Sequence, residues 1–220
     1  DDGLAGTSHL QVPGRFALGA LRSLLDDFRG VVIGRDPRDT DGFADEAWRR
    51  AFWLGPSGLW AFVTSAIDVA MWDLAGQAAG QPLHRLWGAR VDSVDAYGSG
   101  RMWLAQPTAS IVADAAGDVA RGFRALKMRV ASPELERDVE RVAAVRAAVG
   151  PSVRLMVDCN QGLDLERATR LAERLRAFDV AWIEEPLPFH DVAGHAELRR
   201  RTGVPIATGE NLYLAHEFEA

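Results

Sequence analysis

In the second half of the chain, short apolar runs alternate with longer stretches whose apolar residues recur at helical spacing. Three of the runs lead into a carboxylate: Asp158 in VRLMVDCN, Glu184 in AWIEEP and Glu210 in PIATGEN. The intervals are equal, 184 − 158 = 26 and 210 − 184 = 26. The amphipathic stretches between them cover 165–178 and 192–201. This pattern predicts strand, helix, strand, helix, strand, and hence a parallel sheet.

The residues before this segment extend the same repeat. We expect a first strand at 91–97, a helix at 108–120, a second strand at 125–130 and, after the fifth strand, a helix at 213–220. Ligands from consecutive strands favour a barrel, because a doubly wound sheet binds at a switch in strand order. A complete eight-fold barrel needs about 250 residues. Since 220 − 90 = 130 residues follow position 90, we expect only the first five βα units here.

The first half of the chain has helical spacing without a repeat. The pattern predicts helices at 17–28, 40–51 and 59–75, a short helix from Pro82 that ends near Gly88, and a possible strand at 4–10. We therefore predict an α+β domain over residues 1–90 and a barrel domain over 91–220. Nothing precedes the possible strand to form the first strand of a sheet, so we expect the N-terminal domain to lack its beginning.

The composition indicates a soluble globular protein. Of 220 residues, 48% are hydrophobic and 25% are charged, which is enough for a sizeable core. A formal net charge of −6 argues against nucleic-acid binding. We find no apolar run near the roughly 18 residues of a membrane span and no secretory signal, so we predict no membrane partner and a cytoplasmic location. The single cysteine, Cys159, is expected to be a small buried side chain.

The three carboxylates predict a divalent-metal site. The C-terminal ends of parallel strands share one edge of a sheet, so Asp158, Glu184 and Glu210 are expected to converge there. Close carboxylates repel one another unless a cation lies among them. Carboxylate oxygens suit Mg²⁺, or Mn²⁺, and the set contains none of the thiolate or imidazole ligands that favour zinc.

Two cationic residues precede this site by about one repeat. Lys127 and Arg129 in ALKMRV are two positions apart, so they lie on the same face of the predicted strand. The interval 158 − 127 = 31 places this strand immediately before the strand of Asp158. We therefore expect both cations to flank the metal.

Each acidic or histidine residue also has a purely structural interpretation. A single strand-end carboxylate is more often a helix cap or a surface acid, and only the equal spacing together with the cations favours metal binding. For five other residues we prefer the structural interpretation: Asp68 and Asp73 as capping or ion-pair partners, Glu185 as an ion-pair partner on the opposite strand face, and His190 and His195 as locally hydrogen-bonded residues.

Several motifs, in order, resemble the mandelate racemase-like branch of the enolase superfamily: SAIDVAMWDLAGQAAGQPLHRLWG, ALKMRV, LMVDCNQG, WIEEPLPFHDVAGH and PIATGEN. The resemblance implies a modified TIM-type (β/α)₈ barrel with an N-terminal α+β capping domain. It also implies that Asp158, Glu184 and Glu210 ligate Mg²⁺. In this family the metal and a lysine of the second strand, here Lys127, hold a substrate carboxylate while a base removes the α-proton and leaves an enediolate.

In the family pattern, a second lysine on this strand serves as general base. The chain departs from that pattern, because it has Arg129 at this position. Arginine stays protonated, so we predict that Arg129 stabilises charge or binds substrate. Lys127 is a candidate base if neighbouring cations lower its pKa. The resemblance places a His–Asp dyad on later strands, beyond residue 220. Asn160 shares a strand face with Asp158 and either binds substrate or a metal-bound water, or satisfies loop backbone.

The expected function is dehydration of a sugar acid, aldonic or aldaric, to a 2-keto-3-deoxy acid, because dehydration proceeds with one base whereas racemisation needs a base on each face. Two alternatives stay open. One is a racemase or epimerase of a 2-hydroxy acid or related carboxylate, and the other is an inactive truncated fragment, which the intact mass would reveal. The expected partner is a small carboxylate substrate, and assembly into a homo-oligomer is expected from the family.

Overall fold

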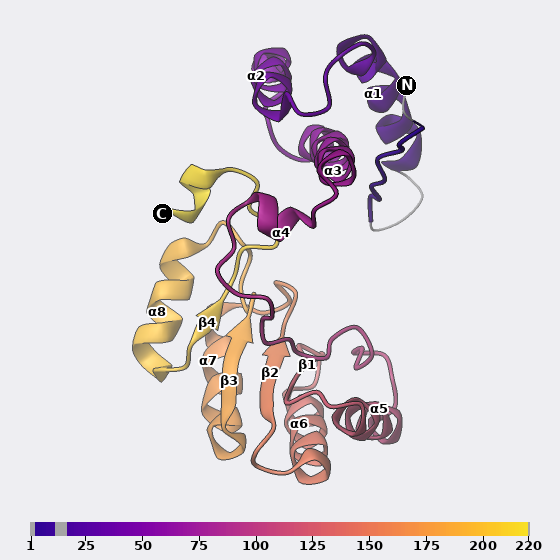
Figure 1. The fold of residues 1–220 in the computed structure, drawn as a ribbon. Coiled ribbons are helices and arrows are strands. Elements are labelled where there is room, and N and C mark those ends of the chain that lie inside the picture. The colour runs from indigo at the N-terminus through magenta and orange to yellow at the C-terminus, as the bar shows by residue number, and fades with distance from the viewer. Residues whose placement is uncertain (1–2, 12–16, 220) are drawn as a thin grey trace. The chain divides into compact units, whose positions relative to one another are not determined.

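In a computed structural model, the structure describes residues 3–11 and 17–219. The chain divides into two compact units, Asp1–Ser93 with Tyr213–Glu219, and Val94–Leu212. The second unit therefore stops at Leu212, whereas the sequence pattern assigned everything up to residue 220 to the barrel. Figure 1 shows the helices and strands of both units. Each unit has its own cluster of buried apolar side chains.

The first unit is helical. Its elements are α1 (Leu18–Val32), α2 (Thr40–Arg50), α3 (Leu59–Ala79) and α4 (Leu83–Leu86), with short 3-10 turns η2 (Ala51–Trp53) and η4 (Ala215–Phe218). The core includes Leu21 and Phe28 of α1, Phe43 of α2, and Val63 and Met71 of α3. The three longer helices thus bury their apolar faces against one another.

The ends of these helices have local causes. The carboxylate of Asp39 accepts a hydrogen bond from the backbone N–H of Gly42, which satisfies one free donor of the first turn of α2. The helix α3 runs four residues beyond the predicted end at residue 75, through Gly76, and stops at Gly80. Gly80 has φ = 60°, a left-handed conformation that glycine adopts without steric cost.

Two predictions for the first unit are wrong. Residues 4–10 form no strand; instead the backbone N–H of Thr7 donates to Asp73, and the Gln77 amide donates to the carbonyl of Ala5. Hydrogen bonds to α3 thus replace those of a strand ladder. In place of the helix expected at 213–220, the structure has only the turn η4. Residues 1, 2 and 220 lie outside the described residues.

The helix α3 is long and apolar enough to cross a membrane by length and composition. It has 21 residues, and the mean hydropathy of its most apolar window is 1.2. The prediction that no segment approaches this length is therefore wrong on these two criteria. A mostly buried core helix of a soluble protein passes the same test, but only 22% of this window is buried, although Val63 and Met71 of α3 belong to the core of the first unit.

The second unit contains a parallel sheet and four long helices. Its strands are β1 (Ala125–Arg129), β2 (Arg154–Asp158), β3 (Val180–Glu184) and β4 (Ile206–Ala207), hydrogen-bonded in the order β1-β2-β3-β4. Its helices are α5 (Thr108–Ala120), α6 (Leu135–Val149), α7 (Leu165–Leu175), extended by the 3-10 turn η3 (Arg176–Phe178), and α8 (Val192–Thr202). The predicted α/β class with a parallel sheet is confirmed.

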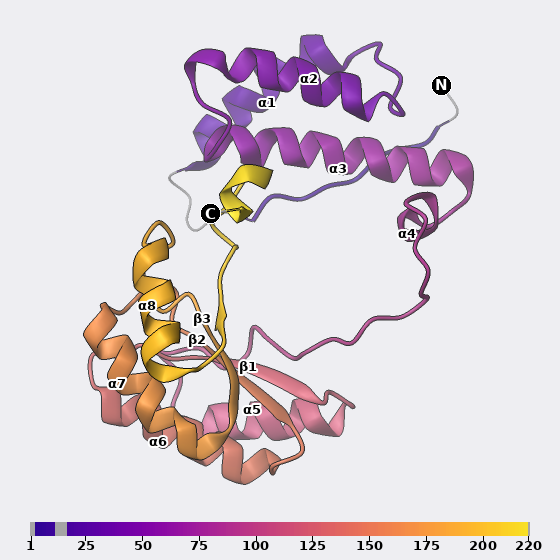
Figure 2. The same ribbon diagram turned by 90° about the vertical axis from the view of Figure 1, so that its left-hand side faces the viewer.

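The two faces of this sheet differ in chemistry. Side chains alternate between the faces, and Met128, Val157 and Ile183 belong to the same buried cluster as residues of α5–α8. Figure 2 shows the ribbons of these helices beside the strands. Cys159 is 2% exposed in the same cluster, so the expectation that it is buried is confirmed. Burial raises the pKa of its thiol well above the usual value. The opposite face carries the charged residues of the second unit's strands.

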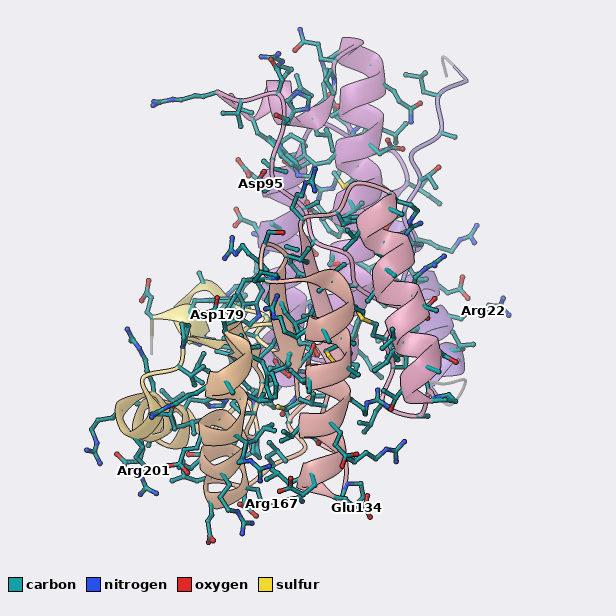
Figure 3. All side chains as sticks on the ribbon, turned by 90° about the horizontal axis from the view of Figure 1, so that it is seen from below. Arg22, Asp95, Glu134, Arg167, Asp179 and Arg201 are labelled. Atoms are coloured by element: carbon teal, nitrogen blue, oxygen red, sulfur yellow. The ribbon has the colours of Figure 1, made fainter. Side chains whose placement is uncertain are left out.

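The outer surface of the helices is polar. On α8, Arg200 and Arg201 form ion pairs with Glu197, at 2.7 and 2.6 Å. Figure 3 shows the labelled Arg201 and Arg167 at the periphery of the structure, away from the sheet. This distribution places apolar side chains between sheet and helices and charged side chains outside, as the amphipathic pattern predicts.

The strand pattern was predicted less well at its two ends. Residues 91–97 form no strand; only Gly98 bridges to Leu126 of β1. The last strand, β4, has two residues and ends three positions before Glu210 (210 − 207 = 3). Among the described residues the sheet therefore has four strands rather than five. Residues 91–97 are exposed and lack the continuous ladder that defines a strand.

Candidate metal centre

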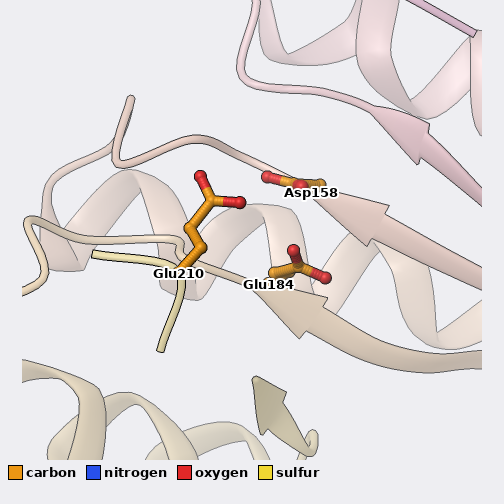
Figure 4. Close-up of side chains that lie close together, drawn as sticks. All are labelled: Asp158, Glu184 and Glu210. Atoms are coloured by element: carbon orange, nitrogen blue, oxygen red, sulfur yellow. The ribbon is translucent and has the colours of Figure 1, made fainter. Parts of the chain in front are cut away.

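The strand register places the charged residues side by side. Arg129, the last residue of β1, is the partner of Asp158, the last residue of β2, and Asp158 is in turn the partner of Glu184 on β3. Glu210 lies in the turn after β4 rather than at a strand end. Figure 4 shows Glu210 reaching toward the other two carboxylates. One oxygen from each of the three carboxylates lies within 4.8 Å of the others.

Lys127 and Arg129 both contact this carboxylate cluster. The ammonium Nζ of Lys127 lies 3.0 Å from Oδ2 of Asp158 and pairs with Oε1 of Glu184. The guanidinium of Arg129 also pairs with Oδ2 of Asp158. Asp158 Oδ2 is buried and lies in ion-pair range of both cations.

The charges of the cluster fit a divalent cation. Two cationic and three anionic side chains leave a formal charge of 2 − 3 = −1 among Lys127, Arg129, Asp158, Glu184 and Glu210. In the part of the chain that the structure describes, no cationic side chain pairs with Glu210. Three convergent carboxylates supply the hard oxygen ligands that Mg²⁺ prefers, so these residues fit the ion.

The condition under which Lys127 was a candidate base is not met in this structure. Its side chain is 8% exposed, and burial opposes its charge, but hydrogen bonds and charge attraction from Glu184 and Asp158 outweigh burial and raise the pKa of Lys127. The prediction assumed that neighbouring cations would lower the pKa. The nearest charged groups in this structure are carboxylates instead, which favour the protonated form of Lys127.

Asn160 lies at the rim of the cluster. Its backbone N–H donates to Asp158 Oδ1 at 2.9 Å, and its amide Nδ2 lies 3.5 Å from Glu210 Oε1. Asn160 has φ = 44°, in the left-handed region that asparagine tolerates better than most residues. Its backbone therefore fixes Asp158, while its exposed side chain faces the third carboxylate.

Four of the five residues given structural interpretations have local partners; for Asp68 the described residues provide neither a cap contact nor an ion pair, and His190 has a ring contact in place of the expected hydrogen bond. Glu185 is 1% exposed, and its carboxylate accepts hydrogen bonds from the Asn211 amide at 3.0 and 3.2 Å, so its partner is an amide rather than the expected cation. Nδ1 of His195 lies 2.8 Å from the carbonyl of Asp191 within α8. Asp73 accepts a hydrogen bond from Thr7, and the ring of His190 packs edge-on against Phe189.

Three aromatic residues at the site were missed by the sequence analysis. The Trp182 indole Nε1–H donates to Glu184 Oε2 at 3.3 Å, and the Tyr97 ring lies 5.7 Å from Lys127 Nζ. The Trp103 ring lies 5.3 Å from Cζ of Arg129. Trp182 was detectable in principle, because it precedes Glu184 by two positions and so shares its strand face. Trp103 lies in a loop and gave no such signal.

The segment that carries Trp103 is anchored by a buried arginine of α6. Arg141 is 0% exposed, and its guanidinium donates to the carbonyls of Trp103, Leu104 and Gln106 at 2.7 to 3.0 Å. The backbone N–H of Arg129 donates to the carbonyl of Met102 in the same segment. These bonds hold the loop at the edge of the sheet where the carboxylates converge.

Comparison with known proteins identifies relatives of this chain. The chain is 38% identical over 200 residues to a 3,6-anhydro-α-L-galactonate cycloisomerase of Streptomyces coelicolor, covering 90% of this chain and 55% of the relative. It is 37% identical over 188 residues to an L-talarate/galactarate dehydratase of Salmonella typhimurium, covering 86% and 47%. The chain thus spans about half the length of the curated relatives it matches.

A solved structure gives the same result for the fold. The L-talarate dehydratase from a Polaromonas species, complexed with Mg and L-glucarate, superposes with a TM-score of 0.85 at 31% identity, covering 98% of this chain and 67% of that one. Residues 1–88 match the mandelate racemase/muconate lactonizing enzyme N-terminal domain, and residues 110–220 match the enolase C-terminal domain-like family. The chain therefore belongs to the mandelate racemase/muconate lactonizing enzyme branch of the enolase superfamily.

Proposed function

We propose that this chain carries the metal-binding part of a Mg²⁺-dependent enzyme that removes the proton α to a carboxylate of a sugar acid and dehydrates it to a 2-keto-3-deoxy acid. The observation that carries the proposal is the convergence of Asp158, Glu184 and Glu210 beside Lys127 and Arg129. The relatives named as dehydratases, and the related structure with Mg and L-glucarate, support this reaction class.

The proposed chemistry requires stabilisation of negative charge. A proton α to a carboxylate is very weakly acidic, and its removal puts two negative charges on adjacent oxygens of the substrate. Asp158, Glu184 and Glu210 would hold Mg²⁺, which when bound supplies Lewis-acid stabilisation of that charge. Lys127 and Arg129 lie beside these carboxylates, and we expect them to donate hydrogen bonds to the substrate carboxylate where the charge develops. The exposed amide of Asn160, next to Glu210, would orient a substrate hydroxyl.

We assign the base to neither Lys127 nor Arg129. Arginine stays protonated in proteins, and the carboxylates that surround Lys127 raise its pKa. Both residues therefore act through their positive charge. A racemase or epimerase that acts on a related carboxylate is the second candidate, since the same charge stabilisation serves both reactions and a related solved structure is named a racemase.

The metal site is tested by titrating Mg²⁺ into the purified protein by calorimetry. We expect the Glu184→Gln variant to lose measurable Mg²⁺ binding, because it removes one ligand charge. Glu173→Gln, an exposed acid on α7 outside the cluster, is the matched control and should bind like the unchanged protein. Equal binding by Glu184→Gln and the unchanged protein would contradict the proposed site.

The reaction is tested with a panel of aldonic and aldaric acids in D₂O with Mg²⁺. Dehydration gives a 2-keto-3-deoxy acid, detected as its semicarbazone, whereas racemisation or epimerisation gives α-deuterium exchange without a keto product. Exchange alone would replace the dehydratase proposal with the second candidate. A homo-oligomeric assembly and a cytoplasmic location stay predictions.

A further inference from the structure

Glu184 is held by a second donor besides Lys127. Oε1 of its carboxylate pairs with the ammonium of Lys127, and Oε2 accepts a hydrogen bond of 3.3 Å from the indole Nε1–H of Trp182. Trp182 and Glu184 both belong to β3 and are two positions apart, so their side chains point to the same face of the sheet. The indole is a neutral donor. It fixes the direction of the carboxylate without neutralising its charge.

Tyr97 supports this arrangement from the neighbouring segment. Its ring packs edge-on against Trp182, with centroids 5.8 Å apart and an interplanar angle of 79°. The same ring lies 5.7 Å from Lys127 Nζ, a cation–π distance. Tyr97 thus contacts both Lys127, which pairs with Oε1 of Glu184, and Trp182, which donates to Oε2.

The position of Tyr97 is set by backbone hydrogen bonds. The N–H of Gly98 donates to the carbonyl of Ala125 at 2.8 Å, and the N–H of Lys127 donates to the carbonyl of Gly98 at 2.9 Å. A side chain at Gly98 would collide with Leu126 and Asp118, because an added Cβ would lie 2.9 and 2.8 Å from their atoms. The close approach of this segment to β1 therefore favours glycine at position 98, and it places Tyr97 beside Lys127.

We infer that Trp182 is a positioning residue for the metal ligand Glu184, and that Tyr97 holds the indole in place. The inference rests on the proposed metal site. A ligating carboxylate that is not oriented by another group must lose rotational freedom when the ion binds, whereas Trp182 restricts that freedom beforehand. Removing an outer hydrogen bond of this kind typically costs 10- to 100-fold in metal affinity.

The experiment compares Mg²⁺ affinity, measured by calorimetry, between the unchanged protein and variants at both aromatic positions. Trp182→Phe keeps an aromatic ring and loses the N–H, so we expect the Kd for Mg²⁺ to rise about 10-fold. Tyr97→Phe keeps the ring that contacts Trp182 and Lys127, so its Kd should stay within about twofold of the unchanged value. Urea unfolding of each variant measures stability separately from affinity.

If Trp182 positions the carboxylate of Glu184, the effect of Trp182→Phe on the Kd should depend on Glu184. A general packing role of the indole would not depend on Glu184. Glu184→Asp keeps the ligand charge but shortens the side chain away from Trp182. In that background, Trp182→Phe is expected to change the Kd by less than about twofold. A loss of the same size in both backgrounds would overturn the inference, because the indole would then act independently of Glu184.

The two proposals fail in different ways. If Glu184→Gln abolishes Mg²⁺ binding and Trp182→Phe binds like the unchanged protein, the metal site stands and the positioning role of Trp182 is wrong. If Glu184→Gln binds normally, the metal site itself is wrong. Should Trp182→Phe fail to fold, Tyr97→Leu decides: a Kd raised about threefold or more supports the inference, and an unchanged Kd overturns it.

Discussion

Arg129 is held on two sides by different interactions. Its guanidinium pairs with Asp158 and lies over the ring of Trp103, and arginine suits this position because a planar cation both stacks on an aromatic face and pairs with a carboxylate. A lysine would retain the charge but not the stacking. The family pattern has lysine as a base here, so this site has exchanged a titratable group for a fixed cation.

The loop behind Trp103 depends on a single buried guanidinium. We predict that Arg141→Met destabilises the second unit by about 3 kcal/mol or more, because the carbonyls of Trp103, Leu104 and Gln106 would lose a buried donor. The measurement is urea unfolding, with the change read from the transition midpoint at constant slope.

Arg174→Met is the matched control for this prediction. Arg174 forms an ion pair with Glu136, but both side chains are about half exposed or more, at 49% and 62%. Such a pair contributes at most about 0.5 to 1 kcal/mol. If Arg141→Met cost no more than Arg174→Met, the buried arginine would not anchor the loop.

At the scale of the element, local sequence determines α7 almost completely. Asp164 accepts a hydrogen bond from the backbone N–H of Arg167 at 2.7 Å, and Ala168, Leu171 and Leu175 form one buried face at helical spacing. We predict that Asp164→Ala costs about 1 kcal/mol of unfolding free energy, because a first-turn N–H loses its acceptor.

Asp164→Asn isolates the cap from the charge. Asparagine caps helices about as well as aspartate, so this variant should lose only a few tenths of a kcal/mol. Urea unfolding measures both. Equal losses for Asn and Ala would mean that the carboxylate charge, rather than the hydrogen bond, stabilises this helix end.

Helices were predictable from sequence here because their hydrogen bonds are local, whereas strands were predictable only where a partner lies alongside. The strands β1, β2 and β3 pair side by side. Each ends at the residue predicted from its apolar run, or within one residue of that position. Residues 91–97 also contain apolar residues, but they are exposed, and only Gly98 next to them gains a bridge to β1. Strand propensity depends on packing against a neighbouring strand, which the local sequence does not report.

The same distinction applies to the site. Asp158 and Glu184 were placed correctly because each ends an apolar run that forms a strand, and they are register partners although the register shifts earlier in this strand pair. Glu210 follows a two-residue strand and reaches the others from a turn. The contacts of Tyr97 and Trp103 depend on loops that run beside β1. Such contacts are set by tertiary packing, so a single sequence predicted the charged residues of the cluster but not the aromatic residues around it.

At the scale of the whole molecule, the chain has two separate hydrophobic clusters, one in each unit, and all three candidate metal ligands belong to the second unit. A separate core is the usual basis of independent cooperative unfolding. We therefore expect calorimetry to show two thermal transitions, of which Mg²⁺ raises only one. The ion binds the folded second unit and not the unfolded chain, in which its ligands are far apart.

The size of this shift follows from mass action. With Mg²⁺ at 100 times its Kd, the second unit gains about 2.7 kcal/mol, which for a unit of 212 − 94 + 1 = 119 residues corresponds to a rise of about 10 °C in its Tm. Asp164→Ala identifies the transition, because it lowers the Tm of the second unit without touching the carboxylates. Glu184→Gln should abolish the shift while both transitions remain. A single transition that moves as a whole with Mg²⁺ would show instead that the two units unfold together, and the metal site would then stabilise the first unit as well.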